Sequence, residues 1–317
     1  MHPFEVRVPG STANLGSGFD SVGMAIDHWL TLHVTPALQT EVVPIDPHLR
    51  EIQTDGENLI LQVMAACFAE AGQPMPQCRV EVSSDIPLAR GLGSSAAAIV
   101  GGLAAANHLL GEPWERDVLY QKAVRWEGHP DNVGASLFGG VVIASWDGDR
   151  LDYITASPPP FLLVAAVPRM QLKTAKARQV LPNTLAHPEA VMGSSRANLL
   201  VAGLLTGDRQ ALAAGLNDRF HQPYRTSLVP GLKAVLEGVT RHGGIGAFLS
   251  GAGPTVMAFA DDPVQVERFL VSALADADVQ ADVYSLESVS TGATVRLTAM
   301  EDRSTVCGNI KGASASR

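Results

Sequence analysis

The stretch RGLGSSAAAIVGG, Arg90–Gly102, combines two closely spaced glycines, two serines and a run of alanines. It follows the strand-like segment QCRVEVSSDIP (77–87), and its apolar spacing predicts a helix over Ser94–Leu110 with Ser94 as the N-cap. The alanines and glycines give this helix a small face, which lets a neighbouring backbone approach closely. The stretch therefore predicts a glycine turn that opens a helix, and the ligand of that turn decides the function.

Several known patterns come close to this turn. Gly91, Gly93 and Ala96 fit the dinucleotide fingerprint G-x-G-x-x-A, but SSDIPLAR separates them from the strand end where that fingerprint belongs. A Walker A loop needs a lysine that the stretch lacks, and a hydrolase elbow needs G-x-S-x-G. Two interpretations remain from these residues. One is a packed turn without a ligand, and the other is a phosphate cradle of backbone N–H groups at a helix start.

The composition favours a small-molecule substrate. The 317 residues are 46% hydrophobic, which is enough for a substantial core in two domains or one large one. A formal net charge of −9 does not favour a nucleic acid or an anionic membrane as partner. Cys67, Cys78 and Cys307 lack metal-like spacing, and neither a leader pattern nor a long apolar run is present. We therefore expect a cytoplasmic protein without nucleic-acid or membrane partners.

Helical and strand-like segments are mixed without strict alternation, which predicts an α+β fold. FEVRVPG (4–10) predicts a strand that stops at Pro9–Gly10, and EGHPDNVGAS (127–136) predicts a loop. Helices are predicted over Asn58–Ala71 and Pro263–Ala275. The prolines at 158–160 resist both helix and sheet, so we predict domains over 1–157 and 158–299 and a flexible tail over 300–317.

Three ordered motifs resemble those of one enzyme superfamily. PLARGLGSSAA (87–97) is similar to the phosphate loop of the GHMP kinases, P-x-x-x-G-L-G-S-S-A-A. VPGSTANLGSGFDSVGMAID (8–27) and GIGAFLSGAGPTVMAF (244–259) resemble its two companion motifs. The resemblance implies a non-Walker ATP loop in an N-terminal domain like the second domain of ribosomal protein S5. It also implies a ferredoxin-like C-terminal domain.

Further stretches resemble the homoserine kinase family within that superfamily. They are EGHPDNVGASLFGG (127–140), KTAKARQVLP (173–182) and DRFHQPYRTSLVPG (218–231). The resemblance implies transfer of the γ-phosphoryl group of ATP to the hydroxyl of L-homoserine, which gives O-phospho-L-homoserine for threonine biosynthesis. ATP and Mg²⁺ are the implied cofactors, L-homoserine is the implied substrate, and a homodimer is one candidate assembly.

For the acceptor, the resemblance assigns Arg178 and Arg225 to the carboxylate, whose planar shape suits a guanidinium fork. Asp20 matches the residue that receives the ammonium group, and Asn14 the residue beside the reacting hydroxyl. Asn132 matches a further substrate-binding position. These five residues are the predicted substrate site.

The catalytic residues that the resemblance implies are Asn132, Asp131, Thr174 and Arg178. Thr174 resembles a threonine near the transferring phosphate. Phosphoryl transfer depends mainly on alignment and charge stabilisation, so a strong base is not required. STANLG also lacks the lysine of mevalonate-type relatives. Asp131 is therefore a positioning group or a general base, and the sequence leaves both open.

For the nucleotide, Asn58 resembles a residue at the adenine pocket, and Ser95 and Glu127 resemble the Mg²⁺ ligands. Gly251–Gly253 resemble the glycine loop that shapes the site. The predicted nucleotide-binding residues are Asn58, Pro87, Leu88, Ala89, Arg90, Gly91, Leu92, Gly93, Ser94, Ser95, Ala96 and Ala97.

Each residue type also has an ordinary structural use. Most arginines lie at protein surfaces, and Asn14 and Asp20 could stabilise their loop through bonds to backbone. We expect His129 and His221 to orient loops or fill structural positions rather than to catalyse. The rival functions are another GHMP kinase of the mevalonate type, an NAD-dependent oxidoreductase and a non-catalytic nucleotide-binding relative. The paired arginines and the missing lysine disfavour the mevalonate type, and the distance of the glycines from the strand end disfavours the oxidoreductase. The retained loop serines, Glu127 and both arginines disfavour a non-catalytic relative.

Overall fold

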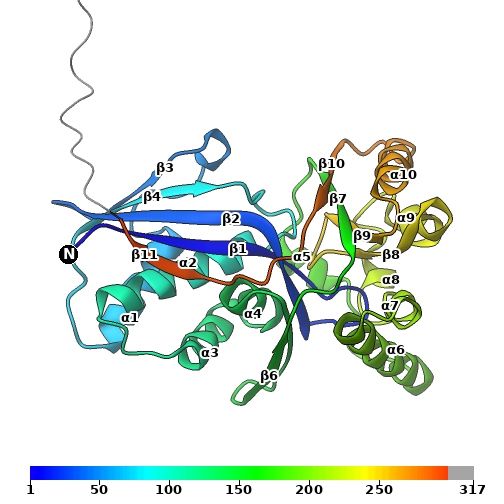
Figure 1. Ribbon diagram of the computed structural model, residues 1–317, viewed down its shortest axis with the longest axis horizontal. Helices are drawn as coiled ribbons and strands as arrows, with labels where there is room; N and C mark the ends of the chain where they lie inside the picture. The colour runs from blue at the N-terminus through cyan, green and yellow to red at the C-terminus, as the bar shows by residue number, and fades with distance from the viewer. Residues whose placement is uncertain (299–317) are drawn as a thin grey trace, which may run out of the picture.

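Two β-sheets lie along the long axis of the protein, each with helices packed against it (Figure 1). The computed structural model describes residues 1–298. Most strands of the first sheet come from the N-terminal half of the chain, and those of the second come from the C-terminal half. The predicted α+β class is confirmed.

The first sheet has the strand order β11-β1-β2-β4-β3, and β5 pairs with β2 and with β6. Its strands are β1 (Phe4–Ala13), β2 (Val22–Pro36), β3 (Glu41–Pro44), β4 (Cys78–Ser84), β5 (Val141–Trp146), β6 (Leu151–Ala156) and β11 (Thr294–Leu297). All pairings are antiparallel except that of β3 with β4. Alternate residues of β4 are buried, as expected for strands with one face on the core.

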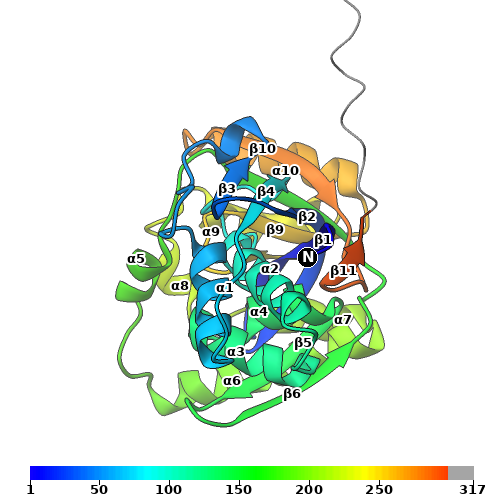
Figure 2. The same ribbon diagram turned by 90° about the vertical axis from the view of Figure 1, so that its left-hand side faces the viewer.

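The helices of the first half are α1 (Leu59–Glu70), α2 (Ser94–Leu109), α3 (Arg116–Glu127) and α4 (Asp131–Phe138). α2 and α4 lie against β1 and β2, and the end-on view shows the four helices grouped together (Figure 2). The small face of α2 has the predicted use, since a Cβ atom at Gly102 would lie 2.9 Å from the carbonyl oxygen of Ile60 in α1. This close packing places the first turn of α2 at the site described below.

The second sheet has the order β10-β7-β9-β8 and is fully antiparallel. Counted from β7 this order is 4-1-3-2, that of a ferredoxin-like sheet. Its strands are β7 (Leu162–Pro168), β8 (Gly244–Leu249), β9 (Val256–Ala260) and β10 (Ala281–Leu286). The helices of this half are α5 (Thr174–Gln179), α6 (His187–Thr206), α7 (Arg209–Gly215), α8 (Gln222–Arg225), α9 (Leu232–Gly238) and α10 (Pro263–Ala275).

Local structure departs from the predictions in three places. β1 continues past Pro9–Gly10, because a register shift in its pairing with β2 absorbs the irregularity. The N-cap of α2 is Gly93, in a left-handed conformation, and Ser94 is the first helical residue. The predicted loop over 127–136 is wrong from residue 131 on, where α4 begins. Position 134 in that helix needs a glycine, because a Cβ atom there would lie only 2.5 Å from Tyr120 Oη.

The end of the described chain returns to the first sheet. Ile26 forms an isolated bridge with Ser288, and β11 pairs with β1. The predicted division at 157 and 158 places this returning segment in the second domain, so the sheets do not follow that division. The predicted tail over 300–317, with Cys307, lies outside the described residues. None of the helices within residues 1–298 is long and apolar enough to cross a membrane.

Candidate functional site

A cavity of about 420 Å³ brings together loops and helix ends from both halves of the chain. Most of the predicted site residues line it: Asn14, Asp20, Asn58, Leu88, Ala89, Gly91, Gly93, Ser94, Ser95, Glu127, Asp131, Asn132, Thr174, Arg178 and Arg225. Gly251–Gly253 also line it. Residues up to 239 positions apart in sequence, Asn14 and Gly253, therefore share one cavity.

The turn before α2 is fixed by close backbone packing. Gly93 has φ 74° and lies against β1, so a Cβ atom there would be 2.2 Å from Ser11 Oγ. Gly91 has φ 81°, and its Cβ atom would be 2.4 Å from the carbonyl oxygen of Ser250. No side chain caps the N-terminus of α2. The first N–H groups of a helix lack internal partners and favour negative charge, so this end of the cavity suits a phosphate.

Five of the predicted nucleotide-binding residues do not line the cavity: Pro87, Arg90, Leu92, Ala96 and Ala97. Leu92, Ala96 and Ala97 are fully buried in the core. The guanidinium group of Arg90 donates to the carbonyl oxygens of Leu88, at 3.1 Å, and Arg169, at 2.7 Å. These residues pack on the side of the turn and helix that faces away from the cavity, because the residues of a tight turn cannot all face one ligand.

Asn58, which is predicted to lie at the adenine pocket, already has a structural role. Its amide oxygen accepts from the N–H of Ile60 at 2.9 Å and caps α1, and its amide nitrogen donates to the carbonyl oxygen of Gln53 at 2.6 Å. The cavity wall nearby is apolar and includes Leu49, Ile52, Leu59, Ile60, Val82 and Ile86. Such a wall suits a flat aromatic base.

Ser95 and Glu127 meet where α2 begins and α3 ends. Ser95 Oγ donates to Glu127 Oε2 at 3.1 Å. Burial raises the pKa of the Glu127 carboxyl above its ordinary value, and the neighbouring His129 and Ser95 partly offset this. Oxygen donors of this kind are the ligands that Mg²⁺ prefers. The pair thus fits a divalent cation beside the phosphate end of the cavity.

A second oxygen-rich group lies nearby. The ligand atoms of Asp20, His129 and Asp131 all lie within 4.8 Å of one another. Asp20 is engaged by Arg178, however, and His129 Nδ1 lies 2.9 Å from Asp131 Oδ1. Burial alone lowers the pKa of His129, but the hydrogen bond and charge of Asp131 outweigh it and raise that pKa. These partners make the group an ion-pair cluster rather than an open set of metal ligands.

Asp20 and Arg178 form a bidentate ion pair at one end of the cavity, the end predicted to hold the acceptor and here called the acceptor end. Arg178 Nη1 and Nη2 donate to the two carboxylate oxygens at 2.9 and 2.7 Å. The side chains are 33% and 38% exposed, so both charges remain accessible from the cavity. Asn14 fixes the loop by accepting from the N–H of Asp20 and donating to the carbonyl oxygen of Gly251, both at 2.9 Å. The predicted ammonium and carboxylate partners therefore bind each other.

Arg225 is buried behind this pair. Its Nε donates to the carbonyl oxygen of Ala177 at 3.1 Å, and its Nη1 donates to that of Gly251 at 3.0 Å. Burial, followed by the charge of Arg178, lowers the pKa of Arg225 to about 10, so the group stays charged at neutral pH. The guanidinium carbons of Arg178 and Arg225 lie 5.6 and 5.4 Å from the centre of the Phe19 ring. Two cations thus converge on one end of the cavity.

Three predicted catalytic residues line the cavity between the two ends of the site: Thr174, Asn132 and Asp131. Thr174 is the first residue of α5 and is exposed. Asn132 Oδ1 accepts from Ser11 Oγ at 3.0 Å, which leaves its amide nitrogen as a donor. Asp131 is 2% exposed and also accepts from the N–H of Asn132 at 2.7 Å. The arrangement can therefore align a hydroxyl group between the phosphate and acceptor ends.

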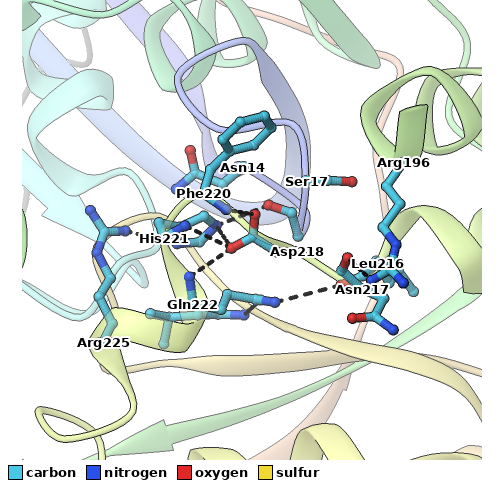
Figure 3. Close-up of polar contacts among 12 residues, drawn as sticks. Asn14, Ser17, Arg196, Leu216, Asn217, Asp218, Phe220, His221, Gln222 and Arg225 are labelled. Atoms are coloured by element: carbon cyan, nitrogen blue, oxygen red, sulfur yellow. Dashed lines mark hydrogen bonds and ion pairs between the residues drawn. The ribbon is translucent and has the colours of Figure 1, made fainter. Parts of the chain in front are cut away.

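The sequence predictions missed the support beneath Arg225 (Figure 3). Asp218 is buried and accepts from the N–H groups of Phe220, His221 and Gln222 at 2.6, 2.9 and 2.6 Å. His221 contacts Arg225, as predicted for a residue that orients a loop. The sequence did contain a signal for this contact. An aspartate often accepts hydrogen bonds from the backbone N–H groups two to four positions after it.

Comparisons with known proteins identify the family of the chain. Residues 58–140 match the GHMP kinases N terminal domain, and residues 200–276 match the GHMP kinases C terminal domain. A homoserine kinase from Deinococcus radiodurans is 45% identical over 82% of this chain and 85% of the relative. One from Carboxydothermus hydrogenoformans is 40% identical over 88% of this chain and 92% of the relative. The crystal structure of homoserine kinase from Cytophaga hutchinsonii matches with a TM-score of 0.82 at 28% identity, over 93% of this chain and 98% of that chain.

Proposed function

Because the chain belongs to the homoserine kinase family of the GHMP kinases, we propose that its cavity aligns ATP and L-homoserine end to end. The enzyme transfers the γ-phosphoryl group of ATP to the hydroxyl of L-homoserine and forms O-phospho-L-homoserine, a step of threonine biosynthesis. The roles of individual residues in this reaction follow from the contacts within the cavity.

The ion pair of Asp20 with Arg178 is the observation that carries the acceptor assignment. L-homoserine is a zwitterion, so its ammonium group can take the Asp20 carboxylate while its carboxylate takes Arg178. Arg225 adds a second cation beside the first. An uncharged acceptor such as a sugar would leave these charges without new partners, and a ligand without an ammonium group would leave Asp20 uncompensated.

The phosphate groups of ATP belong at the turn before α2. The N–H groups of the first helical turn and the helix dipole stabilise their charge, and the left-handed glycines bring the backbone close. Catalysis then consists mainly of alignment, with positive charge and N–H donors facing the transferring group. Thr174 and the amide nitrogen of Asn132 supply further donors on the cavity wall.

Mg²⁺ is proposed at Ser95 and Glu127. The donor chemistry fits, since both side chains offer oxygen atoms 3.1 Å apart beside the phosphate end. The ion would supply charge neutralisation on the phosphate oxygens. A homodimer and a cytoplasmic location stay predictions.

ADP formation by the purified protein with MgATP tests the function. L-homoserine, D-homoserine, L-serine, L-threonine, mevalonate and galactose serve as separate acceptors. We expect strong turnover with L-homoserine, because its carboxylate and ammonium groups match the charges of Arg178, Arg225 and Asp20. Turnover with mevalonate or galactose alone would contradict the acceptor assignment, and absence of nucleotide turnover would contradict the kinase assignment.

A further inference from the structure

His221 is a fully buried contact between the two parts of the acceptor site (Figure 3). Its Nδ1 lies 3.0 Å from Nη1 of Arg225, in the helix α8. Its Nε2 lies 2.9 Å from the carbonyl oxygen of Gly16, in the loop between β1 and β2. One imidazole ring thus joins Arg225, which is assigned to the acceptor carboxylate, to the loop that carries Asp20.

These partners determine the protonation state of the ring. An arginine can only donate, so Nδ1 of His221 must accept and carries no hydrogen. A carbonyl oxygen can only accept, so the hydrogen lies on Nε2. Burial lowers the pKa of His221 to about 4 despite the opposing charge of Asp218, in agreement with a neutral ring.

The same contact decides which nitrogen of Arg225 remains available. Nε donates to Ala177, and the two hydrogens of Nη1 go to Gly251 and His221. Within residues 1–298, Nη2 of Arg225 has no hydrogen-bond partner, and Arg225 lines the cavity. The two Nη2 hydrogens are therefore the donors left for a ligand carboxylate.

The loop side of the contact is also tightly constrained. Phe19 stacks on His221 with ring centres 5.2 Å apart and planes 21° apart. A Cβ atom at Gly16 would lie 2.6 Å from the carbonyl oxygen of Leu216, so this part of the loop packs directly on the segment before α8. Asp218 holds that segment through three backbone N–H groups. Displacement of the imidazole would remove one contact from Arg225 and one from the Asp20 loop at the same time.

We propose that His221 is a positioning residue for the acceptor carboxylate, which keeps Nη2 of Arg225 turned into the cavity and fixes the distance of that nitrogen from Asp20. The proposal rests on the proposed function, because the carboxylate concerned is that of L-homoserine. His221 touches neither substrate in this role. It acts by leaving Arg225 a single free donor group and by holding the loop that presents Asp20.

Steady-state kinetics of His221→Asn and His221→Gln test the proposal. The asparagine amide oxygen lies near the position of Nδ1 and can still accept from Arg225, whereas the longer glutamine places its polar atoms toward Gly16. We expect His221→Gln to raise the KM for L-homoserine roughly tenfold or more, the equivalent of a charge-assisted hydrogen bond. The KM for MgATP should change less than about twofold, and His221→Asn should recover most of the loss.

His242→Gln is a matched control. His242 stacks on Phe269 with ring centres 4.2 Å apart, and its Nδ1 lies 3.0 Å from the carbonyl oxygen of Gly238, outside the cavity. This variant loses a comparable stack and backbone contact, so thermal stability should fall while both KM values stay unchanged. Equal increases of the two KM values in His221→Gln, or an unchanged KM for L-homoserine, would overturn the positioning role.

Nitrogen-15 NMR of the wild-type histidines gives a readout that does not depend on the folding of a variant. At pH 7 the His221 ring should be neutral with hydrogen on Nε2, and its Nδ1 signal should shift on addition of L-homoserine. A protonated ring, or no response to L-homoserine, would contradict the proposal. Wild-type protein without homoserine-dependent ADP formation would instead contradict the proposed function, so the two failures are distinguishable.

Discussion

Backbone groups near Gly91 and Gly93 form the end of the cavity proposed for phosphate, whereas side chains as distant in sequence as Asp20 and Arg225 form the end proposed for the acceptor. Backbone N–H groups recognise any phosphate, so a short motif is enough to build the first end. The second end must match one zwitterion and needs charged groups with defined partners. The general half of the site is therefore local in sequence, and the specific half depends on the packing of the two sheets.

Gly93→Ala should have the largest effect. The added Cβ atom would lie 2.2 Å from Ser11 Oγ, and the residue has φ 74°, which an alanine adopts only with strain. We expect a loss of about 3 kcal/mol or more in the free energy of unfolding, together with loss of ATP binding, as measured by urea titration and calorimetry. Gly56→Ala is the control, because nothing lies within 4 Å of its Cβ position.

Arg178→Lys should separate the two ends of the cavity. Lysine keeps the charge but loses the bidentate contact with Asp20, so the KM for L-homoserine should rise roughly 10- to 100-fold, with little change for MgATP. Arg150→Lys removes a comparable arginine contact with Asp152 at an exposed position outside the cavity. It should leave both KM values unchanged. Equal changes of the two KM values in Arg178→Lys would contradict the separation of the cavity into two ends.

The buried support of the acceptor end should appear in the pH dependence of stability. The pKa of His221 is lowered to about 4 in the folded protein. The contribution of the neutral ring to the free energy of unfolding is therefore fully present above the ordinary pKa of about 6.5. This contribution is lost as the pH falls from about 6.5 to about 4, because the unfolded chain binds the proton at a higher pH than the folded protein does. The free energy of unfolding should therefore fall by up to about 1.4 kcal/mol per pH unit more in wild type than in His221→Gln. Parallel curves for the two proteins in denaturant titrations would contradict this.

Asp131→Asn tests whether phosphoryl transfer in this cavity needs Asp131 as a general base. Asparagine keeps the shape and can still accept from the N–H of Asn132. We expect kcat to fall by less than about tenfold, since alignment supplies most of the catalysis and a general base contributes about 10²-fold or more. A loss of that larger size at every pH would make Asp131 the base.

Arg90→Ala should have the smallest effect, although the residue lies inside the phosphate loop motif. Its guanidinium group bonds to the carbonyl oxygens of Leu88 and Arg169 and does not line the cavity. We expect a change of about threefold or less in the KM for MgATP and a loss of about 1 kcal/mol in stability. A much larger increase of that KM would return Arg90 to the nucleotide site.

The turn before α2 was predictable because its determinants are local. Gly91, Gly93 and the helix that follows were predicted within one residue, and α10 matches its predicted range. The helix α4 was missed because Pro, Asp, Asn and Gly are typical of loops, and the packing of Gly134 against Tyr120 is a tertiary effect. The return of β11 to β1 joins residues about 290 positions apart, and no local pattern encodes that pairing.

At the acceptor end, the resemblance predicted the charged residues and not their partners. Arg178 and Asp20 were assigned to opposite ends of a ligand, and the structure pairs them with each other. The role of His221 depends on the carbonyl oxygen of Gly16, 205 positions away. Such contacts follow from the docking of one half of the chain on the other, which composition and periodicity do not specify.

Separate calorimetric titrations of the double variant Arg178→Ala/Arg225→Ala test the two-ended site most directly. A non-hydrolysable ATP analogue is titrated first, and L-homoserine is then titrated into the analogue-saturated protein, with wild type in parallel. We expect the analogue to bind within about threefold of wild type, because its proposed contacts, the N–H groups of the turn before α2 and a cation at Ser95 and Glu127, include neither arginine, while L-homoserine binding is lost. Retained L-homoserine binding, or loss of both ligands in a folded variant, would contradict it.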